Sequence, residues 1–237
     1  MPGADGGGQG AAPRQAGLTP RRGFTLVEAL VVVAVIGVLV AITLPGLSSA
    51  RDTARTCQCT CQMRTLGMLA ASHAEETREM PRSQHSALSH RVQPWGYAFF
   101  ESLTGAPFRT KDAQWAGVFN GPYRCPLDRR TERWSYGYNV YFELAREETH
   151  WRTWRTLSAL RSPARTVVFA ELNNTTTADH AMAHFWTQFG APPEIDGDRH
   201  RPGTGAAFAD GHAESADFAS LFDPDTGRDC FNPATAR

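Results

Sequence analysis

The stretch that decides the fold runs from Phe24 to Leu44 and reads FTLVEALVVVAVIGVLVAITL. Its 21 residues contain a single charged residue, Glu28, and little other polarity. As a helix with a rise of about 1.5 Å per residue, the stretch is roughly 31 Å long, which matches a hydrocarbon core of about 30 Å. It therefore predicts a helix that crosses a membrane once.

Basic residues precede this stretch. Arg14, Arg21 and Arg22 are opposed there only by Asp5, so the N-terminus is expected in the cytoplasm and everything after Pro45 outside it. An ordinary secretory signal would be cut after the apolar run, at small residues. The run ends instead in ITLPG, which does not fit such a site.

The junction before the run reads RRGFTLVE from Arg21 to Glu28. It resembles the type III signal of bacterial prepilins, whose pattern is G-F-T-L-x-E. The resemblance implies that a prepilin peptidase cuts between Gly23 and Phe24 and methylates the new amino terminus. Residues 1–23 would then be a leader peptide.

Glu28 is an unusual residue for a membrane helix, because a carboxylate there costs about 2.5–3.5 kcal/mol on insertion scales. The resemblance to pilins implies an assembly role, in which Glu28 pairs with the amino terminus of a neighbouring subunit's Phe24 and both desolvated charges are offset. The alternative is a glutamate that extends to the lipid headgroups.

The helical pattern resumes after Pro45, a residue that either kinks the helix or marks the end of the membrane span. The predicted packing face of this second part consists of Leu47, Ala50, Ala54, Cys57, Cys61, Leu66 and Leu69. We expect one helix to about Thr77, closed by Met80-Pro81. The predicted division is an N-terminal helix over 24–80, with its transmembrane part at 24–44, and a globular head over 81–237.

The head is predicted to be built from short elements. Strands are expected at Ser135–Tyr141 and at Arg165–Glu171, the second being central, and Pro94–Leu103 reads as helical. Asp210-Gly211 predicts a type I′ hairpin. The fold class is therefore α+β: a long N-terminal helix on a small mixed or antiparallel sheet, as in pilins.

The segment HRPGTGAAFADG, from His200 to Gly211, places nine residues between His200 and Asp210. This spacing resembles a bacterial pseudopilin-like family with a C-terminal H-x9-D-G motif. Further pieces agree with it: CQMRTLG from Cys61, Met80-Pro81, CPLD from Cys125, SYGYN from Ser135 and RSPARTVVFAE from Arg161. The family implies no mechanism for this motif.

The favoured role of His200 is structural, with its side chain hydrogen-bonded to the hairpin backbone. A metal site is the second possibility, and catalysis the third. The metal ligands would come from His200, Asp210 and His212, together with Glu171 or Asp198.

Asp196-Gly197-Asp198 has the alternating carboxylates that suit a hard cation, although no bidentate glutamate follows at EF-hand spacing. Some major pseudopilins bind calcium in C-terminal loops. Calcium at Asp196 and Asp198 is therefore possible, beside a solvated turn as the plainer interpretation. No other cofactor is predicted.

The chain has five cysteines. Cys57, Cys59 and Cys61 cannot converge on one ion, because helix residues two apart point about 200° apart. Cys57 and Cys61 share a face and are expected to line the packing surface or meet a cysteine of the head. Cys125 and Cys230 could form a disulfide with each other or with the helix.

Aromatic residues are frequent in the head and form either its core, which is favoured, or a surface for sugars or peptides. The set is Trp95, Tyr97, Phe99, Phe100, Trp134, Tyr136, Tyr138, Trp151 and Trp154. We find no phosphate loop, nucleophile elbow or zinc-spaced Cys/His pattern, so no enzyme and no catalytic residue are predicted. A net charge of zero argues against nucleic acid as a partner.

The resemblance implies a structural subunit of a type II secretion pseudopilus or a type IV pilus-like filament. Its expected partners are the prepilin peptidase, further copies, other pseudopilins and an inner-membrane assembly platform. The expected location is the bacterial inner membrane, single-pass with an outer head, and then a filament in the periplasm or at the cell surface. Alternatives are a minor or tip pseudopilin that binds a secreted substrate, and a membrane-anchored enzyme with a metal at His200, Asp210 and Glu171.

Overall fold

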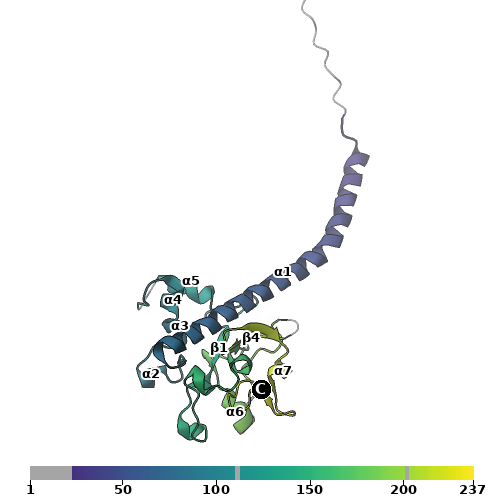
Figure 1. Cartoon of the computed structure of the whole chain (residues 1–237). Helices are drawn as coiled ribbons and strands as arrows, with labels where there is room; N and C mark the ends of the chain where they lie inside the picture. Colours follow the sequence, from purple (N-terminus) through teal and green to yellow (C-terminus); the bar gives the residue numbers. More distant parts are fainter. Residues whose placement is uncertain (1–22, 110–112, 201–202) are drawn as a thin grey trace, which may run out of the picture. The chain divides into compact units, whose positions relative to one another are not determined.

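The computed structural model describes residues 23–109, 113–200 and 203–237. Residues 1–22, which hold the predicted leader and its arginines, lie outside the described residues. The chain divides into two units between Ser48 and Ser49, and each is described by itself (Figure 1).

Helix α1 runs from Leu26 to Thr77 and continues through Pro45. Its first turn is closed by a capping box. The Thr25 backbone N–H and Oγ1 each donate to Glu28 Oε2 at 2.8 Å, and the Glu28 N–H donates to Thr25 Oγ1 at 3.2 Å. The single long helix predicted from the sequence is confirmed.

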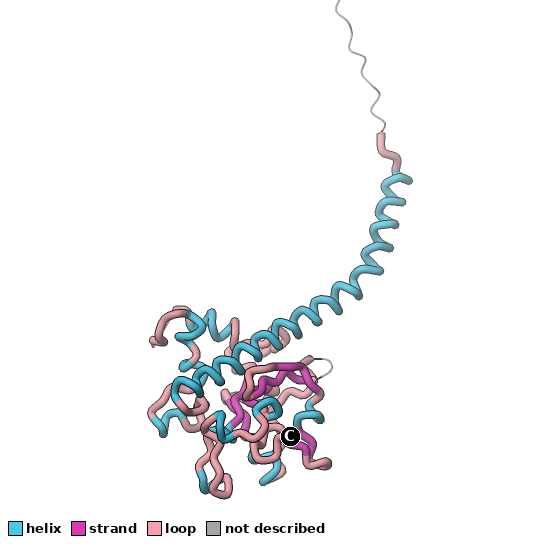
Figure 2. The backbone as a smooth tube through the Cα atoms, viewed as in Figure 1, coloured by secondary structure: helices cyan, strands magenta, loops and turns pink. Residues whose placement is uncertain are grey.

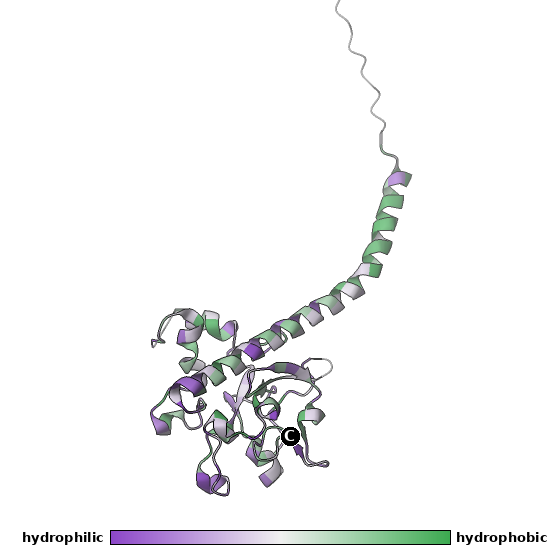
Figure 3. Ribbon diagram, viewed as in Figure 1, coloured by the Kyte–Doolittle hydropathy of each residue, from purple (hydrophilic) through white to green (hydrophobic). Residues whose placement is uncertain are grey.

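In the first unit the helix carries apolar side chains that are exposed within the described part of the chain. Leu26 is 80% exposed and Ile42 is 72% exposed, and Figure 3 shows this part of α1 as strongly hydrophobic. Among the described residues, α1 is the one helix that is long and apolar enough to cross a membrane. The expected single-pass anchor fits this helix.

In the second unit α1 packs on the head through a face that only partly matches the predicted one. The buried residues are Cys59, Met63, Leu66, Gly67, Ala70 and Ala74. The prediction is confirmed for Leu66 and for Leu69, which packs against the core, but it was wrong for Cys57 and Cys61, which are exposed. Small and apolar residues occur on several sides of this part of the helix, so periodicity alone did not fix its rotation. The contact with the sheet fixes it.

The head contains a five-stranded mixed sheet in the order β3-β1-β2-β4-β5. Figure 2 shows the strands of the head in magenta. Its strands are β1 (Tyr136–Asn139), β2 (Val167–Glu171), β3 (His180–Ala181), β4 (Thr204–Phe208) and β5 (Ala213–Ala216). The β1–β3 pair is parallel and the other pairs are antiparallel. The α+β class and the central position of β2 are confirmed.

Short elements surround the sheet. The helices are α2 (Ala87–His90), α3 (Trp95–Ala98), α4 (Phe100–Thr104), α5 (Trp115–Asn120), α6 (Ala183–Phe189) and α7 (Phe218–Leu221). Single 3₁₀ turns lie at Val140–Phe142, Arg146–Glu148, Leu157–Ala159 and Pro163–Arg165, and β6 (Phe222–Asp223) pairs with β7 (Arg228–Asp229). The helical prediction for Pro94–Leu103 corresponds to α3 and α4.

Aromatic side chains fill the core of the head. Trp95 is fully buried, and its ring lies 4.8 Å from that of Trp134, 5.0 Å from that of Phe169 and 5.2 Å from that of Tyr123. Such edge and tilted contacts add to the burial energy. The core interpretation is confirmed for most of the set, but Trp151 is 75% exposed.

The β4–β5 hairpin turns at Asp210-Gly211, as predicted, but with another turn type. The Gly211 N–H donates to the Phe208 carbonyl at 2.9 Å, so Ala209 and Asp210 are the central residues. A type I′ turn needs positive φ at both central residues, whereas only Gly211 has it here, at 89°. The loop is one residue longer than the predicted type I′ connection, and the following glycine supplies the left-handed conformation.

Candidate functional sites

The residues of the predicted cleavage site are accessible in the single chain. Gly23 has no atom within 4 Å of the position that a Cβ would take, and Phe24 is 76% exposed. Glu28 is also exposed, and it forms hydrogen bonds with Thr25. The Gly23–Phe24 junction lies directly before α1, in a segment without regular secondary structure.

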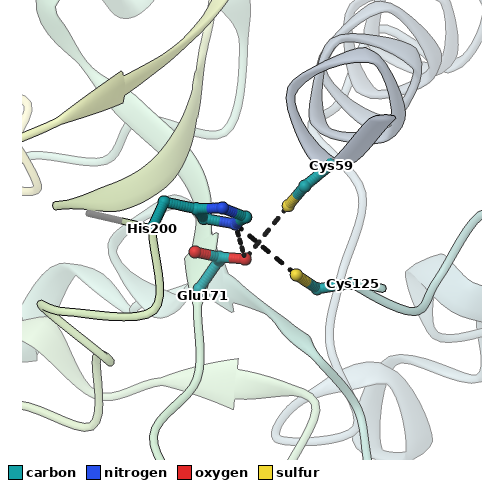
Figure 4. Close-up of side chains that lie close together, drawn as sticks. All are labelled: Cys59, Cys125, Glu171 and His200. Atoms are coloured by element: carbon teal, nitrogen blue, oxygen red, sulfur yellow. Dashed lines mark hydrogen bonds and ion pairs between the residues drawn. The ribbon is translucent and has the colours of Figure 1, made fainter. Parts of the chain in front are cut away.

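A second site lies inside the head, where four side chains from distant parts of the chain converge (Figure 4). Cys59 comes from α1, Cys125 from the loop after α5, Glu171 from the end of β2, and His200 from the segment before β4. All four are buried, and one donor atom from each lies within 4.8 Å of the other three. We refer to these residues as the Cys₂-Glu-His cluster.

The cluster is held together by short contacts. His200 Nε2 lies 2.9 Å from Glu171 Oε1, and Cys59 Sγ lies 3.0 Å from the same oxygen. Cys125 Sγ is 3.5 Å from His200 Nε2. The two thiols, the imidazole and one carboxylate oxygen therefore face a common point.

Polar groups around the cluster fix the orientation of each member. His200 Nδ1 is 3.0 Å from Thr56 Oγ1, and the Gly205 N–H donates to Glu171 Oε2 at 2.9 Å. Two more contacts reach the sulfurs: the Leu127 N–H donates to Cys125 Sγ at 3.4 Å, and the Tyr136 hydroxyl lies 3.2 Å from Cys59 Sγ. Nε2, Oε1 and both sulfurs are thereby directed inward.

The four residues of the Cys₂-Glu-His cluster shift one another's pKa values. Burial alone would raise the pKa of Glu171, but the His200 hydrogen bond and the nearby Arg199 guanidinium, 3.8 Å away, hold it below its ordinary value. Burial opposes the charge on His200, yet its contacts with Cys125 and Glu171 raise its pKa to about 9. The hydrogen bond from Cys59 lowers the pKa of Cys125 to about 7, and the same bond together with burial raises the pKa of Cys59.

His200 and Glu171, two of the metal-ligand candidates, are thus adjacent, but the His200 side chain does not bond the hairpin backbone as expected. Glu171 does so instead, by accepting from Gly205. Asp210 and His212 form their own part-exposed pair in the hairpin, with Oδ1 and Nδ1 2.5 Å apart. They do not belong to the cluster.

The other candidates lie apart. The Asp196 carboxylate pairs with Arg199 at 3.1 Å, and Asp198 is exposed, so a calcium site there stays a prediction. Cys125 and Cys230 are both free thiols. The structure does not pair them, because Cys125 lies in the cluster while Cys230 Sγ lies near the Ser220 carbonyl.

Sequence reasoning missed Cys59 and Cys125 as partners of Glu171 and His200. A local motif could not reveal them, since the four residues are spread over more than 140 positions of the sequence. The helical spacing of Cys59, Met63, Leu66 and Ala70 is compatible with a buried face, but it does not stand out in the sequence from the face that carries Cys57 and Cys61.

Residues 14–44 match the family model described as the prokaryotic N-terminal methylation motif. No curated protein and no solved structure matches the chain. The matched segment includes the Gly23–Phe24 junction and the apolar run but stops before the head, so the H-x9-D-G resemblance rests on its residues alone. The chain therefore carries a type IV pilin-like prepilin signal, in front of a pilin-like α+β architecture.

Proposed function

We propose that this chain is the precursor of a structural subunit of a type II secretion pseudopilus or a type IV pilus-like filament. It is cut after Gly23, and Phe24 becomes the N-methylated first residue. The methylation motif at residues 14–44 supports the pilin-like class.

The observation that carries the proposal is the exposure of the first part of α1. From Leu26 to Leu44 every side chain is exposed in the single chain, and nearly all of them are apolar. So large an apolar surface requires a bilayer or neighbouring helices around it. A subunit stored in the membrane and then packed helix to helix satisfies this requirement in both states.

Glu28 supports the same proposal. Among the described residues, Thr25 donates the hydrogen bonds to its carboxylate, which stands on an otherwise apolar part of the helix. Cleavage creates a positive amino group at Phe24, and the Phe24 of an adjacent subunit supplies the matching cation in a filament. The pair offsets the cost that each charge would carry alone.

The partners that follow are the prepilin peptidase, an inner-membrane assembly platform and other pilin-like subunits. Before assembly the subunit is held in the inner membrane with its head outside the cytoplasm. The filament then extends into the periplasm or from the cell surface. A filament scaffold needs no catalytic residue in the head.

The test is the intact mass and N-terminal sequence of the protein purified from membranes, with and without the prepilin peptidase. We expect a chain that begins at methylated Phe24, and an uncut chain in the peptidase-deficient strain. A chain that stays uncut in the presence of the peptidase, or one cut beyond Leu44, would overturn the proposal.

A further inference from the structure

The donor atoms of the Cys₂-Glu-His cluster have the separations of a tetrahedral metal site. With Zn–S bonds of about 2.3 Å and Zn–N or Zn–O bonds of about 2.0 Å, neighbouring donors around one ion lie about 3.3–3.8 Å apart. The contacts among Cys59, Cys125, Glu171 and His200 measure 2.9, 3.0 and 3.5 Å, and no donor pair exceeds 4.8 Å. Shifts of up to about 1 Å would bring all four donors to these separations around one ion.

We propose that Cys59, Cys125, Glu171 and His200 bind one zinc ion, which fastens helix α1 to the sheet of the head. Binding forms four coordinate bonds and releases to solvent the protons carried by the two sulfurs and by Nε2 of His200, without any change of oxidation state. The proposal does not depend on the filament role, because all four ligands belong to the head unit.

Zinc is favoured by the chemistry of the donor set. Two thiolates, an imidazole and a carboxylate suit this borderline-soft ion, whereas calcium and magnesium take oxygen ligands almost exclusively. Copper(I) would use the thiolates but has little affinity for the carboxylate of Glu171. The donor set of this cluster therefore favours zinc over calcium and copper(I).

The groups around the ligands are those that a zinc site requires. Thr56 holds Nδ1 of His200, which leaves Nε2 as the ligand atom, and Gly205 holds Oε2 of Glu171, which leaves Oε1. The Leu127 N–H donates to Cys125 Sγ, as backbone amides do to metal thiolates. Such partners orient ligands and raise metal affinity.

The charge of the site is partly compensated. Two thiolates and the Glu171 carboxylate carry three negative charges and the zinc ion carries two positive charges. Arg199 lies 3.8 Å from Glu171 and offsets part of the remaining charge, while it also pairs with Asp196 at 3.1 Å. The Arg199 side chain is only 4% exposed, so its charge acts in a poorly solvated region.

The burial of the cluster assigns a structural rather than a catalytic role. Cys59, Cys125 and Glu171 are fully buried and His200 is 1% exposed, so four protein ligands would close the coordination sphere. Catalytic zinc sites keep one position for water or substrate, whereas structural sites do not. The ion would link α1, the loop after α5, β2 and the segment before β4.

A disulfide between Cys59 and Cys125 is the competing fate of the two thiols. It would need an external oxidant that takes two electrons, and the extracytoplasmic compartment expected for the head can provide one. It would also leave Glu171 and His200 without their sulfur partners. Zinc uses all four residues, and it holds both cysteines in the reduced form.

The first experiment measures bound metal in the full chain, extracted from membranes in detergent without reducing agent or chelator. We expect about one zinc per chain by elemental mass spectrometry. Cys59→Ser and Cys125→Ser should lose it. Cys57→Ser and Cys61→Ser are matched controls, because these exposed residues flank Cys59 on the same helix, and they should retain the ion.

The second experiment remains informative if the ligand variants fail to fold. Cobalt(II) replaces zinc in the wild-type chain, and the visible absorption of a tetrahedral thiolate site is recorded. Thr56→Val, which removes only the hydroxyl that orients His200, should weaken metal binding about tenfold or more. Thr53→Val, one turn away on the exposed side of α1, should leave it unchanged.

Three results would overturn the proposal. One is a folded wild-type chain that contains no zinc and takes up neither zinc nor cobalt. Another is a Cys59–Cys125 disulfide, found by peptide mass spectrometry of the unreduced protein. The third is zinc that persists in Cys59→Ser but disappears in Cys61→Ser. A failure of cleavage after Gly23 would leave these measurements unaffected, so the two proposals can fail separately.

Discussion

Gly211 of the β4–β5 hairpin lies beside Gly67 of α1, close enough that a side chain on Gly67 would contact it. A Cβ built on Gly67 would be 3.4 Å from the Cα of Gly211 and 3.5 Å from its carbonyl oxygen. The hairpin that ends the H-x9-D-G segment therefore rests on the helix, while His200 at the start of the segment approaches Thr56 on the same helix. Both ends of the segment thus serve the attachment of α1 to the head.

The contact at Gly67 predicts opposite effects for two substitutions. Gly67→Ala adds a methyl group at ordinary contact distance and gains helix propensity, so the free energy of unfolding should stay level or rise by up to about 1 kcal/mol. Gly67→Val overfills the contact and should cost about 1–3 kcal/mol. Thermal unfolding of both variants in detergent checks this, and equal stability of the two would contradict it.

Substitution of Gly211 should lower the stability of the head because of the backbone conformation at this position. Its φ of 89° is unfavourable for a residue with a Cβ, so Gly211→Ala should destabilise the head by about 1–2 kcal/mol. Gly117→Ala is the matched control, because Gly117 lies in a helix with no atom near its Cβ position, and it should be neutral or stabilising. Unfolding curves in urea distinguish the two outcomes.

Substitutions of the buried Trp95 and the exposed Trp151 test whether the aromatic residues form the core of the head or a binding surface. Trp95→Ala removes the centre of the aromatic core and should cost about 3–5 kcal/mol. Trp151→Ala should change stability by less than about 0.5 kcal/mol, since that ring is 75% exposed. A large loss of stability from Trp151→Ala in unfolding experiments would contradict the exposed position of this ring.

The buried carboxyl group of Asp229 should make the stability of the head depend on pH. Burial raises its pKa from 3.8 to about 6, although the Phe231 and Asn232 N–H groups donate to Oδ1. The folded chain thus binds this proton more tightly than the unfolded chain, so the wild type loses stability as the pH rises from about 4 to about 6.

Asp229→Asn cannot ionise, so its stability relative to the wild type should grow over the same range, by about 1–3 kcal/mol. Unfolding at pH 4 and at pH 7 provides the measurement. Asp225→Asn, at an exposed position nearby, is the control and should give a difference that does not vary with pH. A constant difference for Asp229→Asn would refute the assignment.

Substitution of Glu28 should impair filament assembly without impairing the N-terminal processing. Glu28→Gln keeps the shape of the side chain but removes the charge that would meet the Phe24 amine of a neighbour, and breaking such a buried pair costs about 3–5 kcal/mol. We expect normal cleavage and membrane insertion but a large loss of sheared or sedimented filaments. Glu75→Gln, at an exposed position near the end of α1, should assemble normally.

Much of the fold could be predicted because its signals are local. The length of α1 follows from an apolar run and its helical continuation, and β2 follows from the run TVVFAE. The rotation of α1 was predicted wrongly, with Cys57 and Cys61 buried in place of Cys59, because the polar contrast around that part of the helix is weak. The turn type at Asp210-Gly211 was also wrong, since the dipeptide suits more than one hairpin loop.

The sequence by itself determined the N-terminal processing signal and the membrane-length helix, because each is a property of one contiguous segment and does not depend on tertiary packing. Only the tertiary structure decided which cysteine faces the core, and that Cys59, Cys125, Glu171 and His200 meet at one point. That meeting depends on the pairing of β2 with β4 and on the seating of α1 against the sheet. Long-range packing of this kind leaves no trace in the spacing of residues along the chain.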